Sequence, residues 1–246
     1  MLHGEFTAIT TIDRLSPGLV PKPLGWGKFQ QQRTETPETY FLLEDFLTLH
    51  PDPPNPAKLF GFAVPTYDGK VAHTTAWEPS WSAFFTRLLR RTLATDEEAN
   101  GPWPALRAAA DRILAALAPR LLEPLAIIPC LIHGDLWAGN TGTDAATGDV
   151  VFYDAASYYA HSEMELGMWR RGAPAYLGRR YMREYLDLVG PAEPRDEFED
   201  RNRLYCLQYL LSYSVGHPGP VERRTALNDM LFLCEKYAPF GHAPEI

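Results

Sequence analysis

The sequence predicts an α+β fold in which a short strand-containing part precedes a mostly helical part. Two stretches, 19–27 and 39–46, have the composition of extended strands and follow a helix-compatible run over 1–15. In the second half of the chain, apolar residues recur mainly at the three- and four-residue spacing of amphipathic helices. Two short apolar runs, 127–132 and 150–153, interrupt these helices and enclose a polar loop.

Length and composition are those of a globular protein with a substantial core. The chain has 246 residues, of which 46% are hydrophobic and 12% aromatic. We expect two parts: residues 1–46 form a small lobe with a connecting hinge, and residues 47–246 form a helical lobe that carries the polar loop.

The charge balance argues against two classes of partner. The formal net charge is −8, and an acidic surface favours neither nucleic acid nor an anionic membrane. Arg170, Arg171, Arg179 and Arg180 form a candidate basic patch. We favour the alternative, in which they lie on a solvated helix face.

Cysteine usage and the lack of targeting segments predict a cytoplasmic protein. Cys130, Cys206 and Cys234 have no metal-binding spacing and are expected to be reduced thiols. No stretch near the start resembles a signal peptide, and no apolar run approaches the roughly 20 residues of a membrane helix.

The elements after the first strands follow from local signals. Residues 47–58 are proline-rich and predict a loop, and Asp68-Gly69 predicts the turn of a hairpin over 59–70. Residues 106–122 have the pattern of an amphipathic helix that Pro119 ends or kinks. We expect further helices over 77–94, 161–169, 173–188, 198–215 and 222–237.

The polar loop carries the strongest functional signal. His133, Asp135, Leu136 and Asn140 reproduce the spacing His-x-Asp-Leu-x-x-x-Asn of a kinase catalytic loop. In such a loop the Asp orients the hydroxyl nucleophile and the Asn holds Mg²⁺. The alternative is a turn formed by His133 and Asp135, with Asn140 as a cap.

Asp154 supplies the second ligand that a magnesium site needs. It ends the apolar run 150–153, which has strand character. Charge on a transferring phosphate is neutralised by metal, and a hard cation takes oxygen ligands from carboxylates and amides. Asn140 and Asp154 are therefore the predicted metal ligands, and Asp135 is the predicted catalytic residue.

The segments around these residues resemble one kinase family. Leu-Ile-His-Gly-Asp-Leu-Trp-Ala-Gly-Asn at 131–140 and Phe-Tyr-Asp-Ala-Ala-Ser-Tyr-Tyr at 152–159 are similar to the fructosamine kinases, also called ketosamine-3-kinases or protein-ribulosamine 3-kinases. This family is a branch of the kinases that resemble aminoglycoside phosphotransferases. The resemblance extends from about Gly4 to about Pro218. It implies a protein-kinase-like fold with a truncated small lobe and a mostly helical large lobe.

The resemblance also implies an activity. Members use ATP and Mg²⁺ to phosphorylate a sugar hydroxyl of a ribulosamine or fructosamine on glycated protein lysines. By this resemblance Asp135 accepts the hydroxyl proton, Asn140 and Asp154 hold Mg²⁺, and His133 braces the loop. Relatives also have an acidic residue after the metal aspartate whose carboxylate supports the backbone of the catalytic loop, and Glu165 is the candidate for that role. The expected partner is a glycated protein or a small ketosamine, and we expect a monomer.

At the N-terminal end the pattern is incomplete. Glu5 is similar to the family's helix glutamate, which pairs with a lysine that contacts the nucleotide phosphates. An equally acceptable alternative is a glutamate that stabilises the start of its helix. The glycine-rich loop and that lysine would precede residue 1, and Lys22 and Lys28 follow Glu5 instead. We therefore expect a fragment, an incomplete gene product or a degenerate member.

Binding residues outside the loop are less specific. Glu44 and Phe46 occupy the hinge position that receives adenine in this fold, although an ordinary buried strand fits the same run. Trp77, Trp81 and Trp137 are candidates for stacking on the acceptor sugar. For Trp81, whose spacing matches a buried helix face, core packing is the alternative that we favour, and we favour packing for Trp137 too.

Three rival functions stay open at this point. A non-catalytic, kinase-like protein or truncated product would fit the missing phosphate-binding elements. A phosphotransferase for another small, hydroxylated cationic acceptor would fit the acidic charge. Metal-assisted hydrolysis through Asp135, Asp154 and His133 is the weakest, because the asparagine and the spacing fit kinases better.

Overall fold

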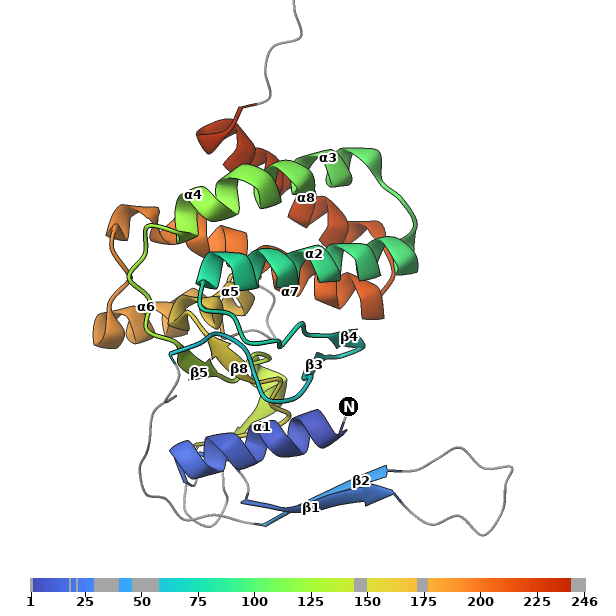
Figure 1. The fold of residues 1–246 in the computed structure, drawn as a ribbon, viewed down its shortest axis with the longest axis vertical. Helices are drawn as coiled ribbons and strands as arrows, with labels where there is room; N and C mark the ends of the chain where they lie inside the picture. The colour runs from blue at the N-terminus through green and yellow to red at the C-terminus, as the bar shows by residue number, and fades with distance from the viewer. Residues whose placement is uncertain are drawn as a thin grey trace, which may run out of the picture.

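The computed structural model describes residues 2–17, 19–20, 22–28, 40–45, 58–143, 150–171 and 177–239, with the backbone alone at 28 and 40–45. Figure 1 shows a helix and a two-stranded sheet at one end of these residues and several long helices at the other. Short strands and loops lie between the two ends and contain the polar loop.

The N-terminal end consists of one helix beside a strand pair. Helix α1 spans Leu2–Leu15 and buries one apolar face. Strands β1 (Lys22–Lys28) and β2 (Tyr40–Asp45) pair antiparallel. The helix and both strands confirm the predicted order of elements.

A small hairpin and a long helix follow. Strands β3 (Tyr67–Asp68) and β4 (Val71–Ala72) pair antiparallel. The turn lies at the predicted Asp68-Gly69, but the hairpin covers 67–72 instead of the predicted 59–70. Helix α2 spans Trp81–Asn100, whereas the sequence predicted a start near residue 77. The reason is a cap: the Ser80 hydroxyl accepts a hydrogen bond from the Ala83 backbone N–H at 3.2 Å and fixes the first turn.

A wide turn interrupts the helix predicted over 106–122. Helix α3 (Pro104–Arg112) leads into a π-helical turn at Ile113–Leu117 and then into α4 (Ala118–Leu122). Pro119 has no N–H, and its ring clashes with the carbonyl four residues earlier. The backbone widens accordingly, and the N–H just before this proline bonds to the carbonyl five residues back.

Four short strands frame the polar loop. Strand β5 (Cys130–Ile132) pairs antiparallel with β8 (Tyr158–Ala160). Strand β6 (Thr141–Thr143) pairs antiparallel with β7 (Val150–Phe152). A 3₁₀ turn at Ala138–Asn140 ends the loop just before β6.

Helices α5 to α8 complete the large end. A 3₁₀ turn at Ser162–Met164 precedes the short α5 (Leu166–Trp169), where the sequence predicted one helix over 161–169. Helices α6 (Gly178–Val189), α7 (Phe198–Gly216) and α8 (Pro220–Tyr237) follow the predicted order.

A buried ion pair gives a reason for the tight turn before α5. Glu163 lies in this turn, and its carboxylate accepts hydrogen bonds from Arg201 Nε at 2.7 Å and Arg201 Nη2 at 2.9 Å. Both side chains are almost completely buried. A buried charge is costly unless it is paired, so the chain must present Glu163 to α7 at this point.

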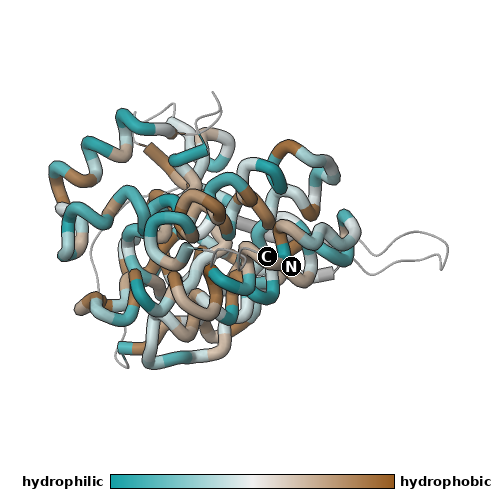
Figure 2. Tube along the Cα trace, turned by 90° about the horizontal axis from the view of Figure 1, so that it is seen from above, coloured by the Kyte–Doolittle hydropathy of each residue, from teal (hydrophilic) through white to brown (hydrophobic). Residues whose placement is uncertain are grey.

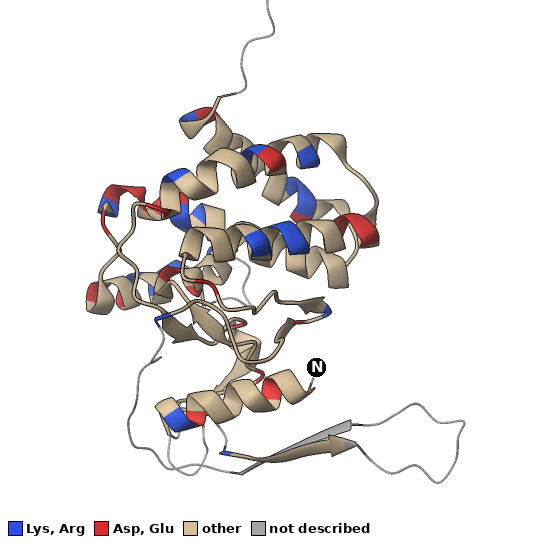
Figure 3. Cartoon of the chain, in the orientation of Figure 1, with Lys and Arg blue, Asp and Glu red and all other residues tan. Residues whose placement is uncertain are grey.

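The surface carries mixed charge. Figure 2 shows hydrophilic and apolar residues alternating along the outer helices, and Figure 3 shows both signs of charge spread over them. Arg170 pairs with Glu199 at 2.9 Å and Arg171 with Glu222 at 2.7 Å, which weakens the candidate basic patch. Among the described helices, none has the length and apolarity to cross a membrane.

The cysteines agree with the sequence-based expectation. Cys206 and Cys234 are buried, Cys130 is partly buried, and all three are free thiols.

Candidate active site

The catalytic-loop sequence adopts a conformation that requires glycine at its centre. Gly134 has φ +84°, which L-residues rarely adopt. A Cβ atom at this position would also lie 2.5 Å from the Ala156 carbonyl oxygen. The loop and the segment after Asp154 are therefore in direct backbone contact.

A buried carboxylate supports the loop from below. Glu165 accepts hydrogen bonds from the His133 N–H at 2.6 Å and the Gly134 N–H at 3.2 Å. Burial raises the pKa of Glu165 to about 7, while hydrogen bonds from the loop N–H groups act in the opposite direction. The sequence had indicated Glu165 for this supporting role, and these contacts confirm it.

Asn140 is held against Asp135. Its amide nitrogen donates to the Asp135 backbone carbonyl at 2.9 Å and to the Asp135 carboxylate at 3.0 Å. Because the nitrogen makes both bonds, the amide oxygen of Asn140 is the atom suited to a cation. The 3₁₀ turn at 138–140 buries this side chain and fixes its direction.

His133 connects the loop with the residue before Asp154. One ring nitrogen, Nε2, lies 3.0 Å from the Tyr153 carbonyl, and the other, Nδ1, accepts from the Asp135 N–H at 3.3 Å. Burial lowers the pKa of His133 to about 4, so the ring is neutral at pH 7. Both nitrogens are thus occupied, which leaves His133 unsuited to bind a metal.

Asp154 stands in a strained conformation at the end of β7. Its φ is +60°, in the left-handed region where residues other than glycine are uncommon. Burial raises the pKa of its carboxyl. Strained backbone of this kind concentrates at functional sites.

Asp135 and Asp154 face one cavity. A hollow of about 280 Å³ is lined by Asp135, Asp154 and Ala155, by Glu5 of α1, and by Tyr67 and Gly69 of the hairpin. The structure therefore brings the predicted catalytic residue Asp135 and the predicted metal ligand Asp154 together with Glu5, and Asn140 joins them through its hydrogen bond to Asp135.

Asp68, at the tip of the hairpin, adds a further carboxylate close to Asp135 and Asp154, and the sequence had assigned it only to a turn. Burial raises the pKa of Asp68 to about 6, and the Asp154 charge contributes to the same direction. Burial and the charges of Asp68 and Asp154 raise the pKa of Asp135 to about 8. An Asp-Gly pair is an ordinary turn signal, and nothing in it indicates proximity to a loop more than sixty residues away.

The donor set fits magnesium. Mg²⁺ is usually held by one or two carboxylates plus substrate phosphates rather than by a full cage of protein ligands. Among the described residues, no group of three or more His, Cys, Asp or Glu side chains is placed to hold a metal on its own. Asp154 and the amide oxygen of Asn140 would supply the protein share of such a site.

The three tryptophans have different surroundings. Trp81 is 3% exposed, and its indole N–H donates to the Tyr205 hydroxyl at 2.9 Å within the core. The prediction that Trp81 could stack on the acceptor sugar is therefore wrong: Trp81 packs in the core. Trp77 is 44% exposed, and the Trp137 ring lies over Gly139 of its own loop, where a Cβ would overlap it.

The two candidate nucleotide-binding residues lie at the end of a described segment and just beyond it. Glu44 lies in β2, where its backbone pairs with Pro23. Phe46 lies outside the described residues.

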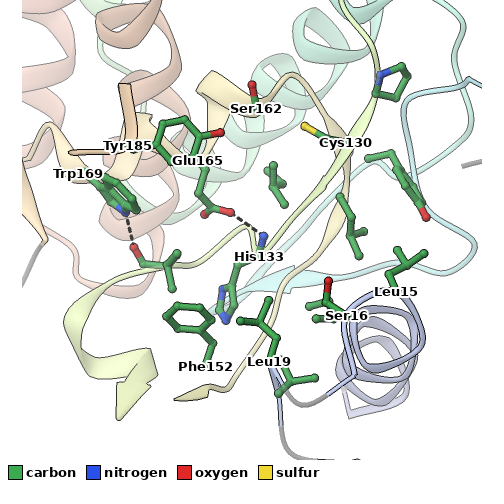
Figure 4. A pocket seen from close by; sticks show the side chains of 17 residues that line it. Leu15, Ser16, Leu19, Cys130, His133, Phe152, Ser162, Glu165, Trp169 and Tyr185 are labelled. Atoms are coloured by element: carbon green, nitrogen blue, oxygen red, sulfur yellow. Dashed lines mark hydrogen bonds between the residues drawn. The ribbon is translucent and has the colours of Figure 1, made fainter. Parts of the chain in front are cut away.

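A second, larger cavity lies behind the loop. It measures about 640 Å³, has a mainly apolar lining and reaches from the end of α1 to α5 and α6. Figure 4 shows Glu165 directed at His133, with Leu15 and Ser16 on the wall nearer α1 and Phe152 beside His133. The catalytic loop thus contributes to the lining of both cavities.

Comparisons with known proteins agree with this geometry. The profile of the family described as fructosamine kinase matches residues 1–219. The mouse protein named ketosamine-3-kinase is 33% identical over 178 residues, which are 70% of this chain and 52% of that protein. A chloroplastic protein-ribulosamine 3-kinase of japonica rice is 31% identical over 160 residues, or 63% of this chain and 43% of that protein. The chain spans about half the length of these curated relatives.

Solved structures show the fold. A putative fructosamine-3-kinase from Thermobifida fusca has a TM-score of 0.71 at 22% identity, covering 96% of this chain and 80% of that chain. The aminoglycoside phosphotransferase APH(4)-Ia has a TM-score of 0.54 at 14% identity, covering 96% and 85%. The predicted kinase-like fold is confirmed.

Proposed function

Because this chain belongs to the fructosamine kinase family, we propose that it transfers the γ-phosphoryl group of ATP to a sugar hydroxyl of a ketosamine. The acceptor would be a ribulosamine or fructosamine, on a glycated protein lysine or as a small molecule. The observation that supports this most is that Asp135 and Asp154 line one cavity while Asn140 hydrogen-bonds the Asp135 carboxylate.

Asp135 would act on the acceptor. Its carboxylate takes the proton of the sugar hydroxyl, whose oxygen bonds to the γ-phosphorus while the bond to the bridging oxygen of ADP breaks. Burial, together with the neighbouring charges of Asp68 and Asp154, raises the pKa of Asp135, which makes its carboxylate a stronger base. Bound Mg²⁺ would neutralise phosphate charge, and Asn140 and Asp154 would hold it.

The other candidate site residues have supporting roles. His133 positions Asp135 and Asp154 relative to each other through its two ring contacts. Glu5 stays a candidate on the nucleotide side because it lines the same cavity. Trp77 and Trp137 stay candidates for contact with the acceptor, and Glu44 and Phe46 for contact with adenine. We also propose that the protein is a monomer and is located in the cytoplasm.

One observation favours a second candidate acceptor class. The carboxylates of Glu5, Asp135 and Asp154 line one cavity and attract a cation. A protonated amine is common to ketosamines and to other small, hydroxylated amines such as aminoglycoside-like compounds. Hydrolysis through a His133-bound metal is disfavoured, because both nitrogens of that ring are already hydrogen-bonded.

The test is transfer of labelled γ-phosphate from Mg-ATP to a ribulosamine- or fructosamine-bearing peptide, with Asp135→Asn as the control. Transfer by the natural chain that this variant loses supports the proposal. Transfer only to an aminoglycoside-like amine supports the second class. Absence of transfer to either acceptor, together with no magnesium-dependent nucleotide binding, identifies a non-catalytic protein.

A further inference from the structure

The cavity of about 640 Å³ behind the catalytic loop has no role in the chemistry described above. Packed protein interiors contain few voids larger than a water molecule, whereas small-molecule sites measure about 300–1,000 Å³. The described residues that line this cavity differ from those that line the smaller cavity at Asp135. It is therefore a separate space with the size of a ligand site.

Most of the cavity wall is apolar. It includes Leu15 at the end of α1, Leu19 and Val20 just after that helix, Leu131 of β5 and Phe152 of β7. Burying a charged group against such side chains is costly, whereas burying an apolar ring is favourable. The wall therefore favours an uncharged, apolar occupant over a phosphate-bearing one.

Two aromatic rings lie at the end of the cavity away from α1 (Figure 4). Trp169 of α5 and Tyr185 of α6 meet edge to face, with ring centroids 6.2 Å apart and an interplanar angle of 89°. The Trp169 indole N–H donates to the Leu136 carbonyl at 2.8 Å, which holds the ring in one orientation. Fixed aromatic rings favour contact with another flat ring, stacked or edge to face.

The polar side chains of the cavity include a carboxylate beside these rings. Figure 4 shows Glu165, Ser162 and Tyr185 on the side away from α1. The Glu165 carboxylate accepts the backbone N–H groups of His133 and Gly134. A carboxylate has about four acceptor sites, so Glu165 can accept a further N–H group from a ligand.

The walls of the cavity are joined to the catalytic loop and to the chain after α1. Leu136, whose carbonyl accepts the Trp169 N–H, directly follows Asp135. On the opposite side, the Phe152 backbone N–H donates to the Leu19 carbonyl at 3.2 Å. An occupant that fills the cavity contacts both walls and so restrains the catalytic loop relative to α1.

We propose that this cavity is a second ligand site, separate from the active site, for a flat, uncharged aromatic molecule whose N–H group donates to Glu165. Its occupant braces the catalytic loop against α1. This inference goes beyond the proposed function and does not depend on it. A suitable probe is 5-fluoroindole, which combines an apolar fused ring with one N–H donor. Its matched control, 5-fluoro-1-methylindole, has the same ring without the donor.

The first measurement uses the natural chain. Binding of both probes is followed by ¹⁹F NMR, and amide hydrogen exchange is followed with and without 5-fluoroindole. We expect the methylated probe to bind at least about 10-fold more weakly, because it cannot make the hydrogen bond to a charged acceptor. Bound 5-fluoroindole should slow exchange over 130–136 more than exchange over α8, which lies outside the cavity.

The second measurement places the probe in the cavity. Leu15→Arg puts a long, charged side chain into the apolar wall. Leu188→Arg is the matched control, because Leu188 of α6 is 88% exposed. We expect Leu15→Arg to weaken binding of 5-fluoroindole about 10-fold or more and Leu188→Arg to leave it unchanged. Unfolding midpoints check that both variants fold, and the probe pair on the natural chain decides the question if Leu15→Arg does not.

The site would be overturned if 5-fluoroindole failed to bind at millimolar concentration, if the two probes bound equally, or if folded Leu15→Arg bound as the natural chain does. Displacement of the probe by Mg-ATP would also overturn it, because the cavity would then belong to the nucleotide site. Unchanged exchange over 130–136 would overturn the bracing of the loop. No readout requires phosphate transfer, so the proposed function stands or fails separately.

Discussion

The Glu165 carboxylate lies 2.6 Å from the backbone nitrogen of His133. This contact places a buried acid directly under the loop that carries Asp135. The loop is therefore held by N–H groups that converge on one side chain rather than by pairing with a neighbouring strand.

Glu165→Gln is expected to destabilise the protein and to lower its activity. Glutamine offers one acceptor oxygen and turns an N–H donor toward loop N–H groups that now lack a partner. A buried donor without a partner costs about 1–3 kcal/mol. Urea unfolding measures this loss. Glu199→Gln is the control, because Glu199 pairs with Arg170 at the exposed surface, and its cost should stay below about 1 kcal/mol.

Gly134→Ala is expected to cost more than its backbone angle alone explains. Gly101 has a similar φ of +80° but open space around its Cβ position, whereas Gly134 faces the Ala156 carbonyl. Gly101→Ala should cost about 1–3 kcal/mol. Gly134→Ala should exceed that value and abolish transfer. Equal unfolding midpoints for the two variants would show that the contact with Ala156 is unimportant.

Asp68→Asn is expected to lower the pKa of Asp135. A neighbouring negative charge disfavours the ionised form of a carboxyl and raises its pKa, so removing the charge moves that pKa down from about 8. The metal-free protein is the sample, and the Asp135 carboxyl is followed by ¹³C NMR against pH. Asp111→Asn, on the exposed face of α3, should leave the titration of Asp135 unchanged.

Two tryptophans that the sequence grouped together are expected to behave differently. Trp81→Ala removes a core side chain and should cost about 3–5 kcal/mol. Trp77→Ala removes a half-exposed ring and should change the free energy of unfolding by much less. If Trp77 stacks on the acceptor, its variant raises KM for the peptide, and an unchanged KM would remove it from the site.

The catalytic loop could be predicted because its chemistry lies in one short stretch. His133, Asp135 and Asn140 are close in sequence, and Asp154 follows at the end of an apolar run. Glu165 was predictable for the same reason, since the family pattern places an acid shortly after the metal residue. In this segment the residues that act together are also close to one another in the sequence.

Asp68 could not be found in the same way. It has an ordinary local interpretation as a turn residue. Its role arises from the packing of the hairpin against a loop far along the chain. The start of α2 was misplaced for a local reason, because the Ser80 cap outweighs the aromatic run that precedes it.

The π-helical turn before Pro119 has a consequence for chain length. Ala109, Ile113, Leu117 and Leu121 are fully buried at a constant spacing of four residues. In a regular α-helix each such step overshoots one turn of 3.6 residues by about 40°, and the row would rotate out of the core. The π-helical turn contains one extra residue, which compensates for this rotation and keeps the buried row on the core side. We therefore expect residues 113–117 to tolerate the deletion of a single residue, since tightening to a regular turn keeps α4 facing inward.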